Sequence, residues 1–225
     1  MTEFAHGSRS KLTERDVPRF ASESLFDRIA RAVCRADCLP RKELYEAWEV
    51  ARRVRRKVRG GRVLDLACGH GLLAHIMLLL DDTSASALAV DTRIPQSAHA
   101  LSAELVRTWP RLASRIEFRS APIESVAAQA ADLIVSVHAC GALTDKVLSV
   151  ALNAGAAIAV LPCCQDARIC DAGPIAGWLD RPLAIDVMRA QRLAAAGYSV
   201  ATQTIPAEIT PKNRLLIGLP QRSPI

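Results

Sequence analysis

Ten residues, Arg62 to Gly71 (RVLDLACGHG), constrain the fold of this chain more than any other stretch. A short β-forming run ends in a turn with glycine at positions 69 and 71, and the apolar segment LLAHIMLLL follows. Strand, glycine-rich turn and helix form the layout of a nucleotide-type cofactor loop. Glycine lets the backbone approach a ligand closely, and the free amides at a helix start favour an anionic group. The stretch therefore predicts the first unit of an α/β sheet.

The rest of the chain continues this alternation of apolar strands and helices. Strands are expected at residues 62–67, 87–90, 115–119, 132–137 and 157–161, with helices at 72–80, 96–108, 123–129, 145–152 and 185–196. Two closing strands, 198–204 and 214–219, are joined by the short turn PAEITPKN. The pattern predicts an α/β fold with a doubly wound, mostly parallel sheet and a C-terminal antiparallel hairpin, preceded by N-terminal helices at 22–36 and 41–59.

Length and composition indicate one globular domain with a small N-terminal addition. The chain has 225 residues, of which 50% are hydrophobic, so a sizeable core can form. Residues 1–18 are expected to be a flexible polar tail and residues 19–60 a helical extension. The start has no apolar signal core, and no segment predicts a membrane span. The 7 cysteines, an odd number without repeat spacing, favour reduced thiols and a cytoplasmic location.

Asp65 narrows the choice of cofactor. A carboxylate near the end of a buried strand is costly unless a cation pairs with it. S-adenosylmethionine (SAM) carries an ammonium and a sulfonium, whereas a dinucleotide carries a pyrophosphate that a carboxylate would repel. The spacing Gly69-x-Gly71-x-x-Ala74 also fits a dinucleotide loop, and Asp91, at the end of the second strand, could bind the ribose of either cofactor.

Three motifs together carry a family resemblance. The run D-x-A-C-G-x-G at Asp65 resembles motif I of the class I SAM-dependent methyltransferases, and HACGALTD (138–145) and VLPCC (160–164) follow later strands. In this combination the chain resembles the methyltransferase-like 25 group, which is related to tRNA 2′-O-methylating enzymes. The resemblance implies a methyltransferase domain over residues 61–225 and SAM as cofactor. It implies SAM contacts from Asp65, Ala67, Cys68, Gly69, Gly71, Asp91, Ile123 and His138.

Polar and thiol side chains follow the fourth and fifth predicted strands. His138 and Cys140 come after the fourth strand, and Cys163 and Cys164 after the fifth. These strands are neighbours in the implied fold, so His138, Cys140 and Cys163 are the candidate catalytic residues on the acceptor side. Three interpretations are open: residues that shape the substrate pocket with His138 as base, structural residues, or a zinc site or thiol nucleophile. Zinc normally requires four well-spaced ligands, so no metal is predicted.

A basic run ends the second predicted helix. Arg52, Arg55, Arg56 and Arg59 have the spacing of one helical face, and the net charge of the chain is +6. Such a stripe can follow a nucleic-acid backbone, although a run of this kind is usually a solvated surface. The sequence thus predicts a SAM-dependent methyltransferase with an unidentified acceptor that could be RNA. The alternatives are a catalytically silent SAM- or RNA-binding partner protein and, third, an NAD-dependent oxidoreductase.

Overall fold

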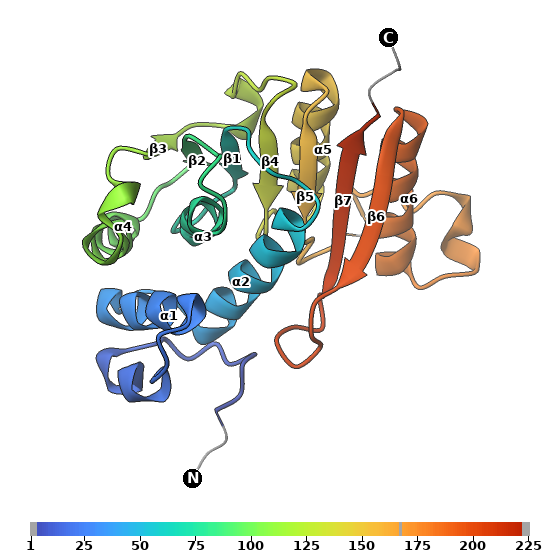
Figure 1. Ribbon diagram of the computed structural model, residues 1–225. Coiled ribbons are helices and arrows are strands. Elements are labelled where there is room, and N and C mark those ends of the chain that lie inside the picture. Colours follow the sequence, from blue (N-terminus) through green and yellow to red (C-terminus); the bar gives the residue numbers. More distant parts are fainter. Residues whose placement is uncertain (1–3, 167, 222–225) are drawn as a thin grey trace.

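The computed structural model describes residues 4–166 and 168–221 and is built on one seven-stranded sheet (Figure 1). The strand order is β3-β2-β1-β4-β5-β7-β6. The strands are β1 (Val63–Leu66), β2 (Ala87–Asp91), β3 (Ile116–Ser120), β4 (Leu133–Ser136), β5 (Ala157–Val160), β6 (Tyr198–Thr204) and β7 (Arg214–Pro220). The first five pair in parallel, while β7 runs antiparallel to both β5 and β6. The predicted α/β fold with its C-terminal hairpin is confirmed.

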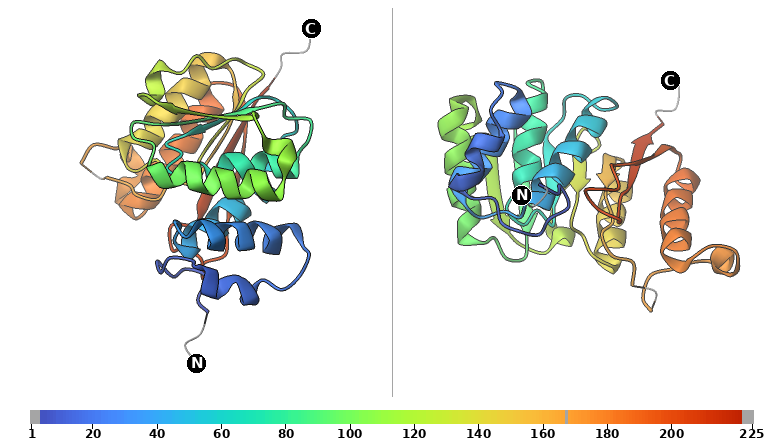
Figure 2. Two further views of the ribbon diagram at one scale, coloured as in Figure 1. Left: turned by 90° about the vertical axis from the view of Figure 1, so that its left-hand side faces the viewer. Right: turned by 90° about the horizontal axis from the view of Figure 1, so that it is seen from below.

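Helices cover both faces of the sheet (Figures 1 and 2). They are α1 (Leu25–Ala36), α2 (Arg41–Arg55), α3 (Leu72–Leu80), α4 (Gln96–Thr108), α5 (Ala142–Ala154) and α6 (Arg181–Ala195). Alternate residues of β1 point to opposite faces: Val63 joins the core under α1 to α4, whereas Leu64 and Leu66 join the core under α5 and α6. No helix of residues 4–166 and 168–221 has both the length and the apolar character to cross a membrane.

One predicted helix is wrong. Residues 123–129 form only a short 3-10 turn, Ile123–Ser125, and the chain then continues without regular structure. The Asp132 carboxylate accepts the Gln129 amide at 2.8 Å, and Arg62 binds both Asp132 and the Ala127 carbonyl. These contacts hold the segment in a turn that leads into β4, so a helix does not form there.

Residues 4–18 belong to the predicted flexible tail, but some of them pack against the rest of the chain. The side chain of Leu12 is fully buried, and its backbone amide donates to the Leu39 carbonyl at 2.9 Å. Lys11 pairs with Pro40 in an isolated β-bridge. A few scattered apolar side chains in a polar run, Phe4, Leu12 and Val17, were too weak a signal to predict this packing. The domain boundary near residue 60 stays a prediction.

The basic run after α2 does not form one exposed helical face, so the predicted stripe is wrong. Helix α2 ends at Arg55, and the Arg55 side chain is 2% exposed. Its guanidinium binds Asp81 at 3.0 Å, the Ser84 hydroxyl at 2.8 Å and the Met77 carbonyl at 3.1 Å. Burial lowers the pKa of Arg55 to about 10, which leaves it charged at neutral pH. Arg55 therefore joins α2 to the segment after α3.

We expect Arg55→Met to lower the free energy of unfolding by about 3 kcal/mol, because it leaves the buried Asp81 carboxylate without its closest cation. The exposed Arg56 provides the matched control, and Arg56→Gln should change stability by less than about 0.5 kcal/mol. Urea unfolding followed by circular dichroism measures both. Equal stabilities of the two variants would contradict the structural role of Arg55.

Candidate functional site

The loop between β1 and α3 has an unusual backbone. Ala67, Gly69 and Gly71 all adopt positive φ angles, of 59°, 53° and 69°. The Cys68 amide donates to the Val90 carbonyl at 3.0 Å, and the Gly71 amide donates to the Cys68 carbonyl at 2.8 Å. Left-handed backbone is uncommon for a residue with a Cβ, so Ala67 is a strained position of the kind that gathers at binding sites. The loop is thus a tight, hydrogen-bonded turn at the carboxyl end of the central strand.

The two glycines have different surroundings. A Cβ on Gly71 would lie 2.7 Å from a ring carbon of Phe118, so this position is glycine because the loop packs closely against β3. A Cβ on Gly69 would meet no atom within 4 Å. Gly69 therefore presents its backbone to open space, which is the arrangement a ligand-binding loop needs.

Asp91 binds the loop directly. Its Oδ2 accepts the backbone amide of Gly69 at 3.0 Å, from the end of the neighbouring strand β2. Its other oxygen, Oδ1, makes only long contacts of 3.4 Å to Thr92 and Arg93. The predicted ribose-binding residue thus lies beside the glycine loop and helps to fix its shape.

Asp65 is a buried carboxylate without a cationic partner. Its side chain is on the α3 side of β1, and Oδ2 accepts the Ala74 amide at 3.2 Å. Burial raises the pKa of Asp65 to about 7; the Ala74 hydrogen bond opposes this shift and the nearby Asp91 charge adds to it. Within the described residues, no lysine, arginine or histidine nitrogen lies within 4.0 Å of this carboxylate. The site therefore favours a cation from outside the chain.

A narrow cavity of about 20 Å³ lies between this loop and the N-terminal helices. Four of the predicted site residues line it: Asp65, Ala67, Cys68 and His138. Sequence reasoning missed its remaining lining residues, Leu39, Glu43, Ala47, His70, Leu72, Leu73 and Val137. Those from 39–47 had no recognisable signal, because only the docking of α2 brings that segment to the loop.

Ile123 is not part of this cavity. It is 2% exposed and belongs to the core cluster that contains Ala67 and Val90. Its side chain therefore supports the carboxyl ends of β1 and β2 from the other face of the sheet.

His138 faces a carboxylate from α2. Its Nε2 lies 4.0 Å from Oε2 of Glu46, a side chain that is 2% exposed. The other oxygen of Glu46 pairs with Lys42 at 2.7 Å, while Oε2 is buried without a hydrogen-bond partner in the described part of the chain. At this distance the Glu46 carboxylate lies near the His138 ring without a hydrogen bond to it. Glu46 was not predicted, because nothing in the sequence distinguishes it from Glu43 and Glu49 in the same helix.

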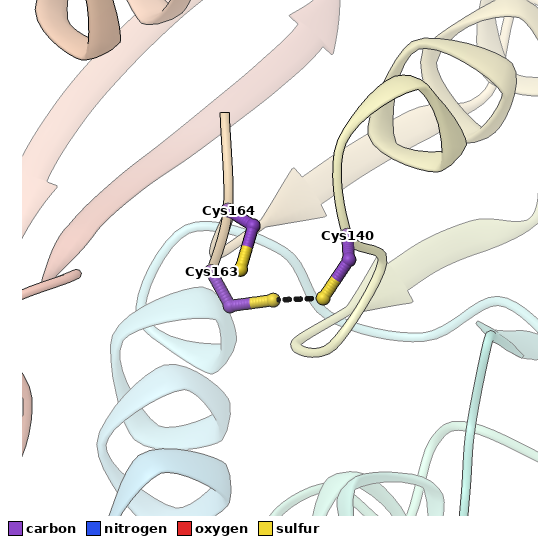
Figure 3. Close-up of side chains that lie close together, drawn as sticks. All are labelled: Cys140, Cys163 and Cys164. Atoms are coloured by element: carbon purple, nitrogen blue, oxygen red, sulfur yellow. Dashed lines mark hydrogen bonds between the residues drawn. The ribbon is translucent and has the colours of Figure 1, made fainter. Parts of the chain in front are cut away.

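The thiols after β4 and β5 lie together, as the adjacency of these strands implies (Figure 3). The Sγ atoms of Cys140 and Cys163 are 2.7 Å apart, and Cys164 completes a group whose Sγ atoms all lie within 4.8 Å of one another. Burial raises the pKa of the Cys140 thiol, and it raises that of Cys163 further, with the neighbouring thiols adding to the shift. Cys140 and Cys163 are therefore weaker acids than a free cysteine.

The comparisons with known proteins assign the class of this chain. A family model described as "Methyltransferase domain" matches residues 41–170, more than half of the sequence. The chain belongs to this methyltransferase family. The match includes α2 and the three motif-bearing loops, which follow β1, β4 and β5. A search of curated proteins gives no match.

Solved structures agree on the fold. An O-methyltransferase family protein from Burkholderia thailandensis is similar with a TM-score of 0.53 and 18% identity, over 95% of this chain and 65% of that one. The mitomycin 7-O-methyltransferase MmcR gives a TM-score of 0.50 and 16% identity, over 91% of this chain and 60% of its own. The chain thus spans less than two thirds of either neighbour.

We expect the two loop glycines to respond differently to alanine. Gly69→Ala should cost about 1 kcal/mol of stability, from the positive φ alone. Gly71→Ala should cost about 2–4 kcal/mol, because the new methyl group also overlaps the Phe118 ring. Thermal and urea unfolding of the two variants check this order, and a more destabilised Gly69→Ala would contradict the described loop.

Proposed function

We propose that this protein transfers a methyl group from SAM to an acceptor. The observation that carries the proposal is the buried Asp65 carboxylate, which lies at the glycine loop of a methyltransferase-family domain without a cationic partner. The α-ammonium of SAM has the charge and size to pair with it. A pyrophosphate in the same loop would face both Asp65 and Asp91, so the charges disfavour a nicotinamide dinucleotide, and the family match does not support an oxidoreductase.

We assign the donor contacts as follows. Asp65 receives the ammonium, the open backbone at Gly69 lies against the methionine part, and Asp91 accepts the ribose hydroxyls through its less engaged Oδ1. Ala67, Cys68, Gly71 and His138 shape the rest of the predicted site, with Ile123 supporting the adenine side. When bound, SAM supplies an activated methyl group, so positioning and exclusion of water are the main tasks of the protein.

We infer that the part of the donor site beside Asp65 widens when SAM binds. Its cavity of about 20 Å³ is far smaller than the several hundred Å³ of a typical ligand pocket. Leu39, Glu43 and Ala47 form the side that belongs to the N-terminal helices. We therefore infer that the start of α2 withdraws from the loop when the donor enters, and that it covers the bound donor afterwards.

His138 is our candidate base for a hydroxyl acceptor. It lines the donor cavity, and Glu46 lies 4.0 Å from its Nε2. Glu46 can stabilise the protonated ring, which would let the opposite nitrogen take the acceptor proton as the methyl group transfers. An acceptor that is already a good nucleophile would need no such base. Cys140 and Cys163 are further candidates for catalytic residues on the acceptor side.

The contacts described above do not identify the molecule that accepts the methyl group. An RNA acceptor loses the support of the predicted arginine stripe, because Arg55 is buried and Arg52 pairs with Glu49 at 3.2 Å. The resemblance to the methyltransferase-like 25 group stays a prediction. Transfer of labelled methyl from SAM into separate RNA, protein and small-molecule fractions would identify the acceptor, and SAM binding without any transfer would favour the silent partner protein.

The affinity for SAM should depend on the protonation of Asp65. The pKa of Asp65 is raised to about 7, and only the carboxylate attracts the ammonium. Affinity should therefore fall as the pH falls through 7, by about tenfold per pH unit well below it. Asp65→Asn should lose about 2–3 kcal/mol of binding at pH 8 and lose this part of the pH dependence. Calorimetry between pH 5.5 and 8 measures both effects.

Asp82 offers a control for that series, because its side chain is 75% exposed and it lies outside the site. Asp82→Asn should bind SAM like wild type at every pH. Both variants share the titration of SAM itself, so their difference isolates Asp65. Unchanged SAM affinity in Asp65→Asn would overturn the cofactor assignment.

Comparing turnover with SAM affinity should show whether His138 acts on the acceptor or belongs to the donor site. We expect His138→Ala to lower methyl transfer to a hydroxyl acceptor by about 100-fold while changing SAM affinity by less than about threefold. Glu46→Gln should lower turnover less and shift its pH profile, because it acts through His138. If SAM binding collapses in His138→Ala and turnover per bound donor does not, His138 belongs to the donor site alone.

A further inference from the structure

Cys140, Cys163 and Cys164 form a group of potential metal ligands that the donor chemistry does not use (Figure 3). Over residues 4–166 and 168–221, this is the one place where three or more histidine, cysteine or acidic ligand atoms lie within 4.8 Å of one another. Figure 3 shows Cys163 and Cys164 on one loop and Cys140 on the other, with the sulfurs in the gap between them.

We propose that these three cysteines bind one Zn²⁺ ion through their thiolates and leave its fourth position open. With Zn–S bonds of about 2.3 Å, a tetrahedral ion holds its sulfurs about 3.8 Å apart. The Cys140–Cys163 separation of 2.7 Å is shorter than this, and the 4.8 Å limit of the group is longer. Binding of an ion would therefore require the side chains of Cys140 and Cys163 to rotate apart.

The two loops are already fixed relative to each other. The Gly141 amide donates to the Cys164 carbonyl at 2.9 Å, which joins the two ligand-bearing segments directly. The Thr144 hydroxyl donates to the Ala139 carbonyl at 2.6 Å, and the buried Arg189 donates to the Gly141 carbonyl at 2.9 Å. Such contacts orient ligands before the ion arrives, which favours binding.

The group is also accessible. Cys140 and Cys164 are exposed, and they line a cavity of about 460 Å³ together with Lys146 and Asp166. This cavity gives an ion a path of entry and leaves room for a water or substrate atom at the fourth position. Three protein ligands and one open position are the arrangement of catalytic zinc sites, whereas structural sites use four. Binding releases the three thiol protons to solvent, so no oxidant or reductant is needed.

Zinc titration of the full chain tests the proposal without any use of methyl transfer. Reduced, metal-stripped protein would be titrated with Zn²⁺ against a chromophoric chelator, and wild type should bind one ion per chain. Cys140→Ser, Cys163→Ser and Cys164→Ser should each weaken binding by more than about 100-fold. Cys38→Ser, at a half-buried thiol outside the group, should bind as wild type does.

A second measurement uses wild-type protein, so it does not depend on whether the serine variants fold. Alkylation of wild-type protein with and without Zn²⁺ should show the ion protecting Cys140, Cys163 and Cys164, while Cys38 reacts equally in both. Three results would overturn the proposal: no zinc uptake by reduced and folded wild type, zinc retained by the triple serine variant, or protection confined to other cysteines. The zinc titration and the alkylation do not depend on whether Asp65→Asn binds SAM. The zinc proposal and the proposed function can therefore fail independently.

Discussion

The central constraint of this structure is a charged side chain in a strand that is buried on both faces. Strand β1 pairs in parallel with β2 and β4, and every residue from Val63 to Leu66 is buried. Asp65 occupies this strand with one hydrogen bond from Ala74 and without a cation among the described residues, so its pKa rises to about 7. An apolar residue would be more stable there. The cost is consistent with a residue kept for binding a cationic ligand.

The parallel sheet brings the remaining chemistry to the same edge. The loops after β1, β2, β4 and β5 all leave the carboxyl ends of parallel strands, which is where open α/β sheets bind ligands. This edge carries the Gly69–Asp91 contact, the His138–Glu46 pair and the three thiols. The N-terminal helices close it, since Leu39, Glu43 and Ala47 lie against the glycine loop. Helix α2 therefore covers the glycine loop, whereas Cys140 and Cys164 at the same edge are exposed.

The accuracy of the sequence predictions followed the strength of the local pattern. Helix α4 and strand β6 have the predicted bounds, because their apolar periodicity ends at clear breaks in the sequence. The predicted helix at 123–129 is wrong, because contacts of Asp132 and Arg62 from elsewhere in the chain hold that segment in a turn. The arginine stripe is wrong for a similar reason. Its spacing suited a helical face, but Asp81 and Ser84 draw Arg55 into the interior.

The sequence alone predicted most strands and helices in their chain order, the glycine loop, and the places of Asp65 in the first strand and Asp91 at the end of the second. These are set by neighbours in the chain, through periodicity, turn chemistry and the cost of burying charge. Only the tertiary structure placed Glu46 beside His138 and packed α2 over the loop. Those contacts join residues far apart in the chain, and their geometry depends on how helices dock and where neighbouring strands end, which no local pattern encodes.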